Sequence, residues 1–236
     1  MQFKRQRTNL RRIFVFILLI WSWPSALSIL IGSGLIIIGQ IIHFISAGYL
    51  VKNGELTTAG PYRFTRNPFY VGNFFYDVGL CVITQNIYVA IIYLPFFYGW
   101  IIRPRVKREE VFLGNKFGAD YESYKQKVPR FIPRIYPAQL EIINGEFRWH
   151  QIIRHRELWR VMRALGLIII FYLKSIIWLT PLDMASIKPR LSLLTSQPLH
   201  LTILIGLLAI IVIPPVCEYW IIPSLSKRKP HWDYQA

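Results

Sequence analysis

The sequence predicts an all-α, polytopic membrane protein with about six transmembrane helices and both termini in the cytoplasm. Its 236 residues are 53% hydrophobic, and the mean hydropathy is +0.35, which is too apolar for an ordinary soluble domain of this length. The net charge is +16, and the Lys and Arg residues cluster beside apolar runs, as positive-inside topology requires. A nucleic-acid-binding protein would share the charge but not the hydrophobicity, so we expect no nucleic-acid partner.

The first apolar region runs from Ile13 to Leu50, after the basic N-terminus MQFKRQRTNLRR. One span needs roughly 20 residues, so this region predicts a helical hairpin that turns near Trp23-Pro24-Ser25. No small-residue cleavage site followed by a polar chain is present, so the first span is interpreted as uncleaved. The second arm, Ala26 to Val51, contains small residues that allow close helix packing. These are Gly32, Gly34, Gly39 and Gly48.

A polar loop from Lys52 to Asn67 separates this hairpin from the next one. Pro68 suits the first turn of a third span that runs to about Thr84. Gln85-Asn86 forms a short uncharged turn, and a fourth span follows from Ile87 to Ile102, with Pro95 as its expected kink.

The chain from Arg103 to Pro133 is predicted to be soluble, with one helix from Lys107 to Tyr124. The basic and aromatic residues up to 163 suit the lipid headgroup layer. We expect a fifth span from Ala164 to Thr180 and a sixth from His200 to Trp220, kinked at Pro214-Pro215. Their role is left open between shaping lipid access, dimerisation and stability.

Lys and Arg determine the orientation of these spans. The N-terminus, 52–67, 103–163 and the tail KRKPHWDYQA are rich in them, whereas the turns near Pro24 and Gln85 have none. Both ends and both charged clusters are therefore expected in the cytoplasm. The membrane would be the cell membrane in a bacterium and the endoplasmic reticulum in a eukaryote.

We expect three parts in the chain: an N-terminal hairpin (1–51), a central core (52–133) and a C-terminal part of unknown role (134–236). No structural metal is expected. The two cysteines, Cys81 and Cys217, are far apart, and no histidine has zinc-ligand spacing to either.

The sequence TTAGPYRFTRN in the first loop can bind an anion. Gly60-Pro61 sets a turn, Arg63 and Arg66 could point to one side, and Asn67 can cap the helix that Pro68 begins. A helix N-terminus with two arginines suits a carboxylate or phosphate. The alternative is an ordinary positive-inside loop.

The third span carries a polar stripe that ends in Asp77, which we place near mid-bilayer. A carboxylate at that depth is a functional candidate by default. Gln40 and His43 form a polar pair on the preceding span, and the alternative role of Asp77 is a structural hydrogen bond to one of them. The stripe consists of Arg66, Tyr70, Asn73 and Asp77.

Two segments together resemble a known family. GPYRFTRNPFYVGNFFYDVG is followed by RPRVKREEVFLGNKFGADYESYKQKVPRFIP, over about Leu56 to Pro133. This pattern resembles the isoprenylcysteine carboxyl methyltransferases and phospholipid methyltransferases, which show a Gly-Pro-Tyr turn, an Arg-His-Pro-x-Tyr-x-Gly motif, a Glu-Glu pair and a Tyr-x-x-Tyr pair.

The resemblance implies a membrane enzyme that uses S-adenosylmethionine to methylate a carboxylate, thiol or amine of a lipid or lipid-anchored acceptor at the cytoplasmic face. Glu109 and Glu110 would bind the ammonium or ribose of the cofactor, and Tyr121 and Tyr124 would flank the site. The residues matching the first motif would help to form the cofactor pocket. They are Gly60, Pro61, Tyr62, Arg63, Arg66, Asn67, Pro68, Tyr70 and Gly72.

One position departs from the motif, because Asn67 stands where the family has His. Asn cannot carry a proton at neutral pH, so this position favours cofactor binding over proton transfer. The change weakens a prenylcysteine assignment more than a methyltransferase one. A carboxylate or thiolate acceptor needs no base, whereas an amine must lose a proton. For an amine, His43 and Asp77 become the candidate catalytic residues.

Two other functions remain open at this point. Membrane sterol reductases carry a similar Arg-His-Pro-x-Tyr motif but bind NADPH, and this chain lacks their extra N-terminal spans. A non-catalytic membrane protein could also keep the same scaffold.

Overall fold

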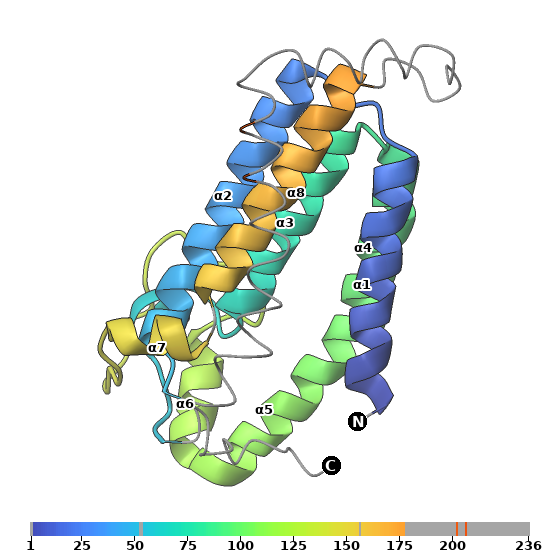
Figure 1. Cartoon of the computed structure of the whole chain (residues 1–236). Coiled ribbons are helices and arrows are strands. Elements are labelled where there is room, and N and C mark those ends of the chain that lie inside the picture. Colours follow the sequence, from blue (N-terminus) through green and yellow to red (C-terminus); the bar gives the residue numbers. More distant parts are fainter. Residues whose placement is uncertain (1, 52–53, 156, 178–201, 203–205, 207–236) are drawn as a thin grey trace.

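The computed structural model describes residues 2–51, 54–155, 157–177, 202 and 206. Every regular element in these residues is a helix, which confirms the all-α prediction for the described part. Apart from residues 202 and 206, the predicted sixth span (His200–Trp220), with Cys217 and the basic tail, lies outside the described residues. Figure 1 shows α2, α3 and α8 running side by side, with α1 beside α4.

The first two helices, α1 (Gln2–Ile20) and α2 (Ala26–Tyr49), turn where the sequence predicts, around Pro24. Ser25 caps α2 in a reciprocal arrangement: its side chain accepts from the Ser28 amide, and its amide donates to the Ser28 hydroxyl. Lys174 of α8 (Glu157–Ile177) donates to the Leu19 and Ile20 carbonyl groups at the end of α1. These contacts hold the hairpin turn against α8.

Helix α3 (Pro68–Thr84) packs closely against α2 through two pairs of glycines. A Cβ added at Gly32 would lie 2.5 Å from the Gly79 carbonyl oxygen, and one at Gly39 would lie 2.5 Å from that of Gly72. The predicted close packing is confirmed at these positions. Gly48 instead contacts the Phe147 ring, and no described residue would lie within 4 Å of a Cβ at Gly34, so the described residues show no close packing there.

The fourth predicted span continues past its expected end. Helix α4 (Ile87–Pro95) passes through a π-helical segment, η2 (Phe96–Ile102), directly into α5 (Arg103–Phe117). Pro104 does not end this helix, because a π-helical turn lies directly before it, and such local adjustments can accommodate an interior proline. The break comes at Gly118, whose φ is +54°, so the predicted helix Lys107–Tyr124 is wrong.

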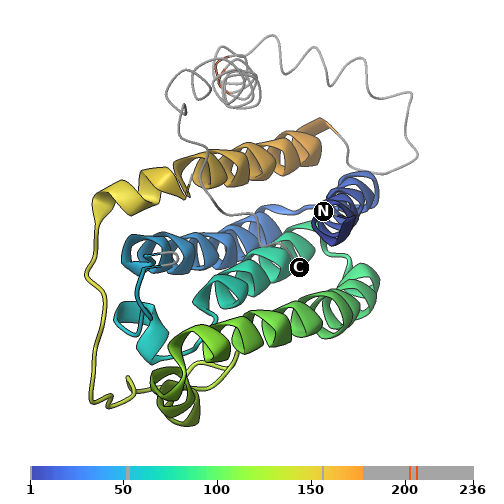
Figure 2. The same ribbon diagram turned by 90° about the horizontal axis from the view of Figure 1, so that it is seen from below.

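The residues after Gly118 form α6 (Ala119–Lys127), which ends before Pro129 as predicted. The segment beyond it contains the short helix α7 (Trp149–Arg154) and then α8, which begins at Glu157 rather than at the predicted Ala164. Helix α8 therefore includes part of the basic, aromatic segment that we expected in the headgroup layer. Figures 1 and 2 both show α8 lying along α2.

Two of the described helices are long and apolar enough to cross a membrane, Ala26–Tyr49 and the continuous helix Ile87–Phe117. Their outward residues are large and apolar: Leu30 is 71% exposed, Ile92 72% and Trp100 75%. An apolar exterior of this kind suits contact with lipid. The six-span topology remains a prediction.

The glycine contacts between α2 and α3 can be tested by adding one methyl group. Gly39→Ala should lower the melting temperature in detergent by several degrees, because overpacking costs roughly 1–3 kcal/mol. Gly34→Ala is the matched control and should not lower it, since Ala favours a helix over Gly by about 1 kcal/mol. Equal melting temperatures for the two variants, measured by intrinsic fluorescence, would contradict the packing.

Candidate functional site

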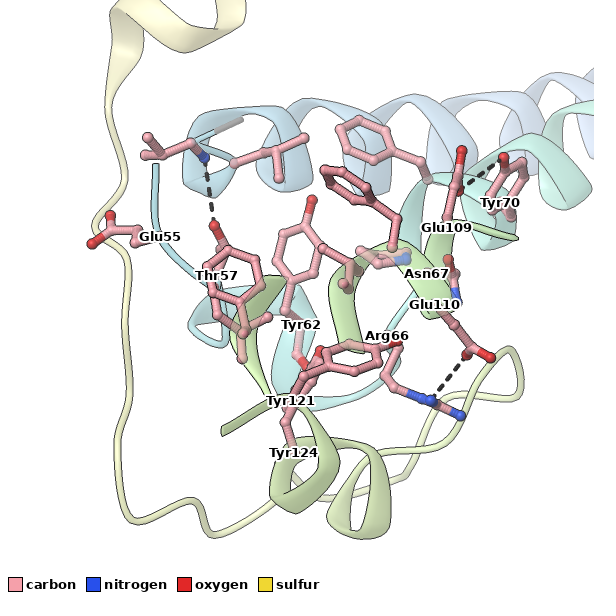
Figure 3. Close-up of a pocket in the computed structure, with 18 of the residues that line it drawn as sticks. Glu55, Thr57, Tyr62, Arg66, Asn67, Tyr70, Glu109, Glu110, Tyr121 and Tyr124 are labelled. Carbon is pink, nitrogen blue, oxygen red and sulfur yellow. Dashed lines mark hydrogen bonds and ion pairs between the residues drawn. The ribbon is translucent and has the colours of Figure 1, made fainter. Parts of the chain in front are cut away.

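A cavity of about 400 Å³ lies where the loop after α2 meets α5 and α6 (Figure 3). It gathers most of the sequence-predicted site residues from both motifs. Those that line it are His43, Tyr62, Arg66, Asn67, Pro68, Tyr70, Glu109, Glu110, Tyr121 and Tyr124. Those that do not line it are Gly60, Pro61, Arg63, Gly72 and Asp77.

Glu110 joins the two motifs through ion pairs. Its Oε1 lies 2.9 Å from Nη1 of Arg66 (Figure 3), and Arg130 donates to both of its carboxylate oxygens. Glu110 and Arg66 are both largely buried. The hydrogen bonds to Glu110 raise the pKa of Arg130 above its ordinary value, so this cation is fixed. The carboxylate of Glu110 is thus shared by two guanidinium groups.

Glu109 lies on the other side of α5 and is less buried. Its Oε1 accepts from Nε of Arg105 at 2.9 Å, and the Tyr70 hydroxyl lies 3.5 Å from its Oε2. Tyr70 belongs to the first motif, so this contact is a second connection between the motifs (Figure 3). Of the acidic pair, Glu109 therefore has more capacity left for a ligand.

The two loop arginines do not form one anion site. Arg66 pairs with Glu110, whereas Nε of Arg63 donates to the Ala138 carbonyl oxygen at 3.1 Å. Asn67 stands before α3, but its side chain makes no capping hydrogen bond, so that expectation was wrong. Its amide instead donates to the Arg130 carbonyl oxygen at 3.0 Å. The loop is thus bound to the segment after α6.

Gly60 is required by the shape of this loop. Its φ is +58°, and a Cβ there would lie 2.5 Å from the Tyr49 ring. Gly60 begins the short helix η1 (Gly60–Arg63), whose Tyr62 points into the cavity (Figure 3). The Gly-Pro turn of the motif therefore shapes the cavity without lining it.

The aromatic pair and Tyr62 form a buried support beside the cavity. The rings of Tyr121 and Tyr124 lie 6.2 Å apart, and the Tyr124 hydroxyl donates to the Tyr62 carbonyl oxygen at 2.7 Å. Burial raises the pKa of Tyr121 to about 12, and it also raises the pKa values of Tyr62 and Tyr124. These phenols therefore stay neutral at physiological pH and serve as hydrogen-bond donors and apolar walls.

Asp77 is fully buried, but it lies away from the cavity. Its Oδ1 lies 2.6 Å from Nη2 of Arg11, and its Oδ2 accepts from the Tyr98 hydroxyl at 2.8 Å. The alternative role for Asp77, a structural hydrogen bond between helices, is therefore present, but its partners are Arg11 and Tyr98 rather than His43 or Gln40. Arg11 lies on α1, so the charge of Asp77 joins the first hairpin to the second.

His43 is buried in the cavity wall beside a residue that sequence reasoning missed. Its Nδ1 lies 3.7 Å from Oε2 of Glu157, at the start of α8. Nη2 of Arg160, one turn later, donates to Oδ1 of Asn73, which also accepts from Arg11 at 3.1 Å. Glu157 lies outside both motifs, and only its position in a basic segment before an apolar run could have drawn attention to it.

The family model of phospholipid methyltransferases matches residues 26–120, from the start of α2 into α6. This central part of the chain is therefore similar to the phospholipid methyltransferases. This match contains the loop, the acidic pair and the α4–η2–α5 helix, and it confirms the resemblance seen in the sequence. Arg130 and Glu157 lie beyond it.

Known proteins similar to this chain come from two groups. It is 31% identical over 143 residues to the nickel-cobalt-cadmium resistance protein NccN of Alcaligenes xylosoxydans xylosoxydans, covering 56% of this chain and 66% of that protein. It is 33% identical over 104 residues to the protein-S-isoprenylcysteine O-methyltransferase of Schizosaccharomyces pombe, covering 44% of each.

The protein of that same name from Mus musculus is 33% identical over 87 residues, or 37% of this chain and 30% of the relative. The matches thus span less than two thirds of these relatives. No solved structure matches the chain significantly.

Within the described residues, no group of three or more His, Cys, Asp or Glu side chains could hold a metal ion.

The ion pairs of Glu110 predict a large effect of one substitution. Glu110→Gln leaves the buried Arg66 guanidinium without its charge partner, and breaking a buried pair costs roughly 3–5 kcal/mol. We expect a fall of about 6 °C or more in the melting temperature in detergent. Glu122→Gln removes an exposed partner of Lys125 and should cost less than about 1 kcal/mol. Similar melting temperatures for both variants would contradict the assignment.

Proposed function

We propose that this protein is an integral-membrane, S-adenosylmethionine-dependent methyltransferase that methylates a lipid or lipid-anchored acceptor at the cytoplasmic face. The observation that carries the proposal is the convergence of both family motifs on one cavity of about 400 Å³. A cavity of this size suits a nucleoside-sized ligand. The similarity of residues 26–120 to phospholipid methyltransferases supports the reaction class.

The side chains around the cavity fit this cofactor. Glu109 offers carboxylate oxygens to an ammonium group or to ribose hydroxyls, Tyr121 and Phe117 offer aromatic surface, and Lys116 offers a cation toward a carboxylate. When bound, the cofactor supplies a methyl group on a sulfonium centre that is already activated. The protein then has to orient the acceptor in line with the bond from sulfur to the methyl group and keep water out of the site. Tyr62, Phe69 and Leu113 line the cavity with apolar surface that excludes water.

The proposed topology has six spans with both termini and the cavity on the cytoplasmic side. Support comes from the cavity's position at the end of α2 and the start of α3, next to the basic loop and the basic α5. The apolar exterior of the long helices allows a lipid-bearing acceptor to approach from the bilayer. Relatives named protein-S-isoprenylcysteine O-methyltransferase support an acceptor of that lipid-bearing kind.

The alternatives make different predictions about ligands. A sterol-reductase-like enzyme would bind NADPH, and a scaffold protein would bind neither NADPH nor S-adenosylmethionine. Two of the similar proteins are named for metal resistance. These names do not specify a reaction, so they do not contradict the proposed methyltransferase activity.

Cofactor binding can be tested by thermal unfolding of the full chain in detergent. S-Adenosylhomocysteine at 100 times its Kd should stabilise the protein by about 2.7 kcal/mol, which corresponds to roughly 5–10 °C. NADPH is the control and should give no shift. A shift with NADPH alone would favour the reductase, and no shift with either compound would rule out both enzymatic functions.

A substitution at Asp77 tests whether this residue has a structural role or binds the cofactor. Asp77→Asn keeps a hydrogen-bond acceptor for Tyr98 but removes the charge that balances Arg11. We expect a lower melting temperature and an unchanged Kd for S-adenosylhomocysteine, because Asp77 does not line the cavity. A tenfold or greater weakening of that Kd, measured by calorimetry, would place Asp77 in the cofactor site.

A further inference from the structure

The segment after α6 exposes three large apolar side chains that lie close together in the sequence. Ile132 is 83% exposed, Ile135 86% and Tyr136 77%. Single apolar residues are normal on a protein surface, but a group of them is typical of a surface that binds a partner. Pro133 and Pro137 restrict the backbone around these residues, which lowers the entropy lost when the segment binds.

Other elements hold the backbone of this segment in place. Phe131 packs against the buried cluster that contains Ile102 and Val106. The backbone amide of Arg134 donates to the Phe64 carbonyl oxygen at 3.0 Å. The exposed apolar side chains therefore extend from a fixed part of the chain.

These contacts place the segment where two spans reach the membrane surface. Ile102 ends η2, and the charged residues of α5 begin directly after it at Arg103. The Asn67 side-chain amide donates to the Arg130 carbonyl oxygen, and Pro68 begins α3 directly after Asn67. In the proposed topology both points lie at the cytoplasmic surface of the bilayer. The segment is therefore at the level of the lipid headgroups.

We propose that residues 131–136 form an interfacial anchor that inserts Ile132, Ile135 and Tyr136 into the cytoplasmic leaflet. The inference rests on the membrane topology of the proposed function and goes beyond it, because it assigns a lipid-binding surface outside the matched segment 26–120. At this level, apolar side chains enter roughly 5–10 Å into the boundary between headgroups and acyl chains.

Neighbouring residues favour a lipid surface as the partner. Trp100 of η2 precedes Ile102 closely and is 75% exposed, and Trp is enriched at membrane interfaces. Arg134 is exposed between Ile132 and Ile135, and a basic side chain there suits the anionic lipids of a cytoplasmic leaflet. The anchor thus adjoins a helix whose exterior already suits lipid.

The anchor is connected directly to the cavity. Arg130, the residue before it, pairs with Glu110, and Glu110 pairs with Arg66. Glu110 and Arg66 both line the cavity. Insertion of the anchor would therefore hold the cavity at the depth of the headgroup layer, where a lipid-bearing acceptor presents its polar end.

Insertion can be measured with a fluorescent label on the full chain in liposomes. The label is attached to Ile135→Cys in a Cys217→Ser background, and the background alone serves as the blank because Cys81 is buried. Lipids that carry a nitroxide near the headgroup should quench this label about twofold or more relative to lipids that carry it at the chain end, because interfacial insertion is shallow.

Two further label positions serve as controls. Ile92→Cys, at an exposed position of α4, should be quenched more by the nitroxide at the chain end. Glu122→Cys, exposed on α6, should be quenched by neither lipid. A label at Ile135→Cys that behaves like the one at Glu122→Cys would overturn the inference. An apolar environment at Ile135→Cys without quenching by lipid would indicate a protein partner and would also overturn it.

The apolar side chains of the anchor can be tested in the same Ile135→Cys protein. Ile132→Asp places a carboxylate in the leaflet and should lower the quenching by the nitroxide near the headgroup at least twofold. Asn115→Asp adds the same charge at an exposed position of α5 and should leave the quenching unchanged. Because both positions are exposed, the melting temperature in detergent should not fall in either variant. Equal quenching in the two variants would contradict the anchor.

The controls separate this inference from the proposed function. If the label at Ile92→Cys is quenched and the one at Ile135→Cys is not, the anchor fails and the membrane topology stands. If the label at Ile92→Cys also escapes quenching, the integral-membrane topology itself fails, and the anchor fails with it. Neither result depends on methyl transfer, which the cofactor-binding measurement tests independently.

Discussion

The close approach of α2 and α3 is the constraint on which the rest of the structure depends. Their backbones touch at Gly32–Gly79 and Gly39–Gly72, so no side chain separates the helices. This contact sets the positions of the end of α2 and the start of α3. It therefore also sets the distance that the loop between the two helices must bridge. It also places His43 beside Gly72, where a Cβ would lie 2.6 Å from the imidazole ring. The cavity wall is therefore a consequence of glycine packing.

Two buried carboxylates connect elements that the glycine contacts do not join. Asp77 joins α1, α3 and η2, and Glu110 joins the first loop, α5 and the segment after α6. Such pairs add little net stability, because desolvation offsets their attraction, but losing one partner is costly. Their effect is to make one arrangement of the helices better than the alternatives. In this arrangement two sequence motifs about 40 residues apart share one cavity.

Local signals in the sequence were sufficient for the turns, helix starts and small-residue contacts, since Pro24, Pro68 and the glycines act over a few residues. Gly118 indicated a helix end after α5, but the predicted helix Lys107–Tyr124 continued through it. The partners of Asp77 could not be predicted, because Arg11 lies 66 positions away and any of several polar residues could have reached it. Glu157 was missed because its role depends on how α8 packs, which no motif encodes.

The walls of the cavity come from two parts of the chain, one inside the segment that matches the family model and one outside it. The loop, Glu109 and Tyr70 lie inside the matched segment 26–120, whereas Glu157 lies on α8, outside it. Substitution at the start of α8 would change the charge facing His43 without touching Arg66, Glu110 or Arg130. One wall of the cavity therefore comes from a helix outside the matched segment, and the charge on that wall can change while the ion pairs of Glu110 stay the same.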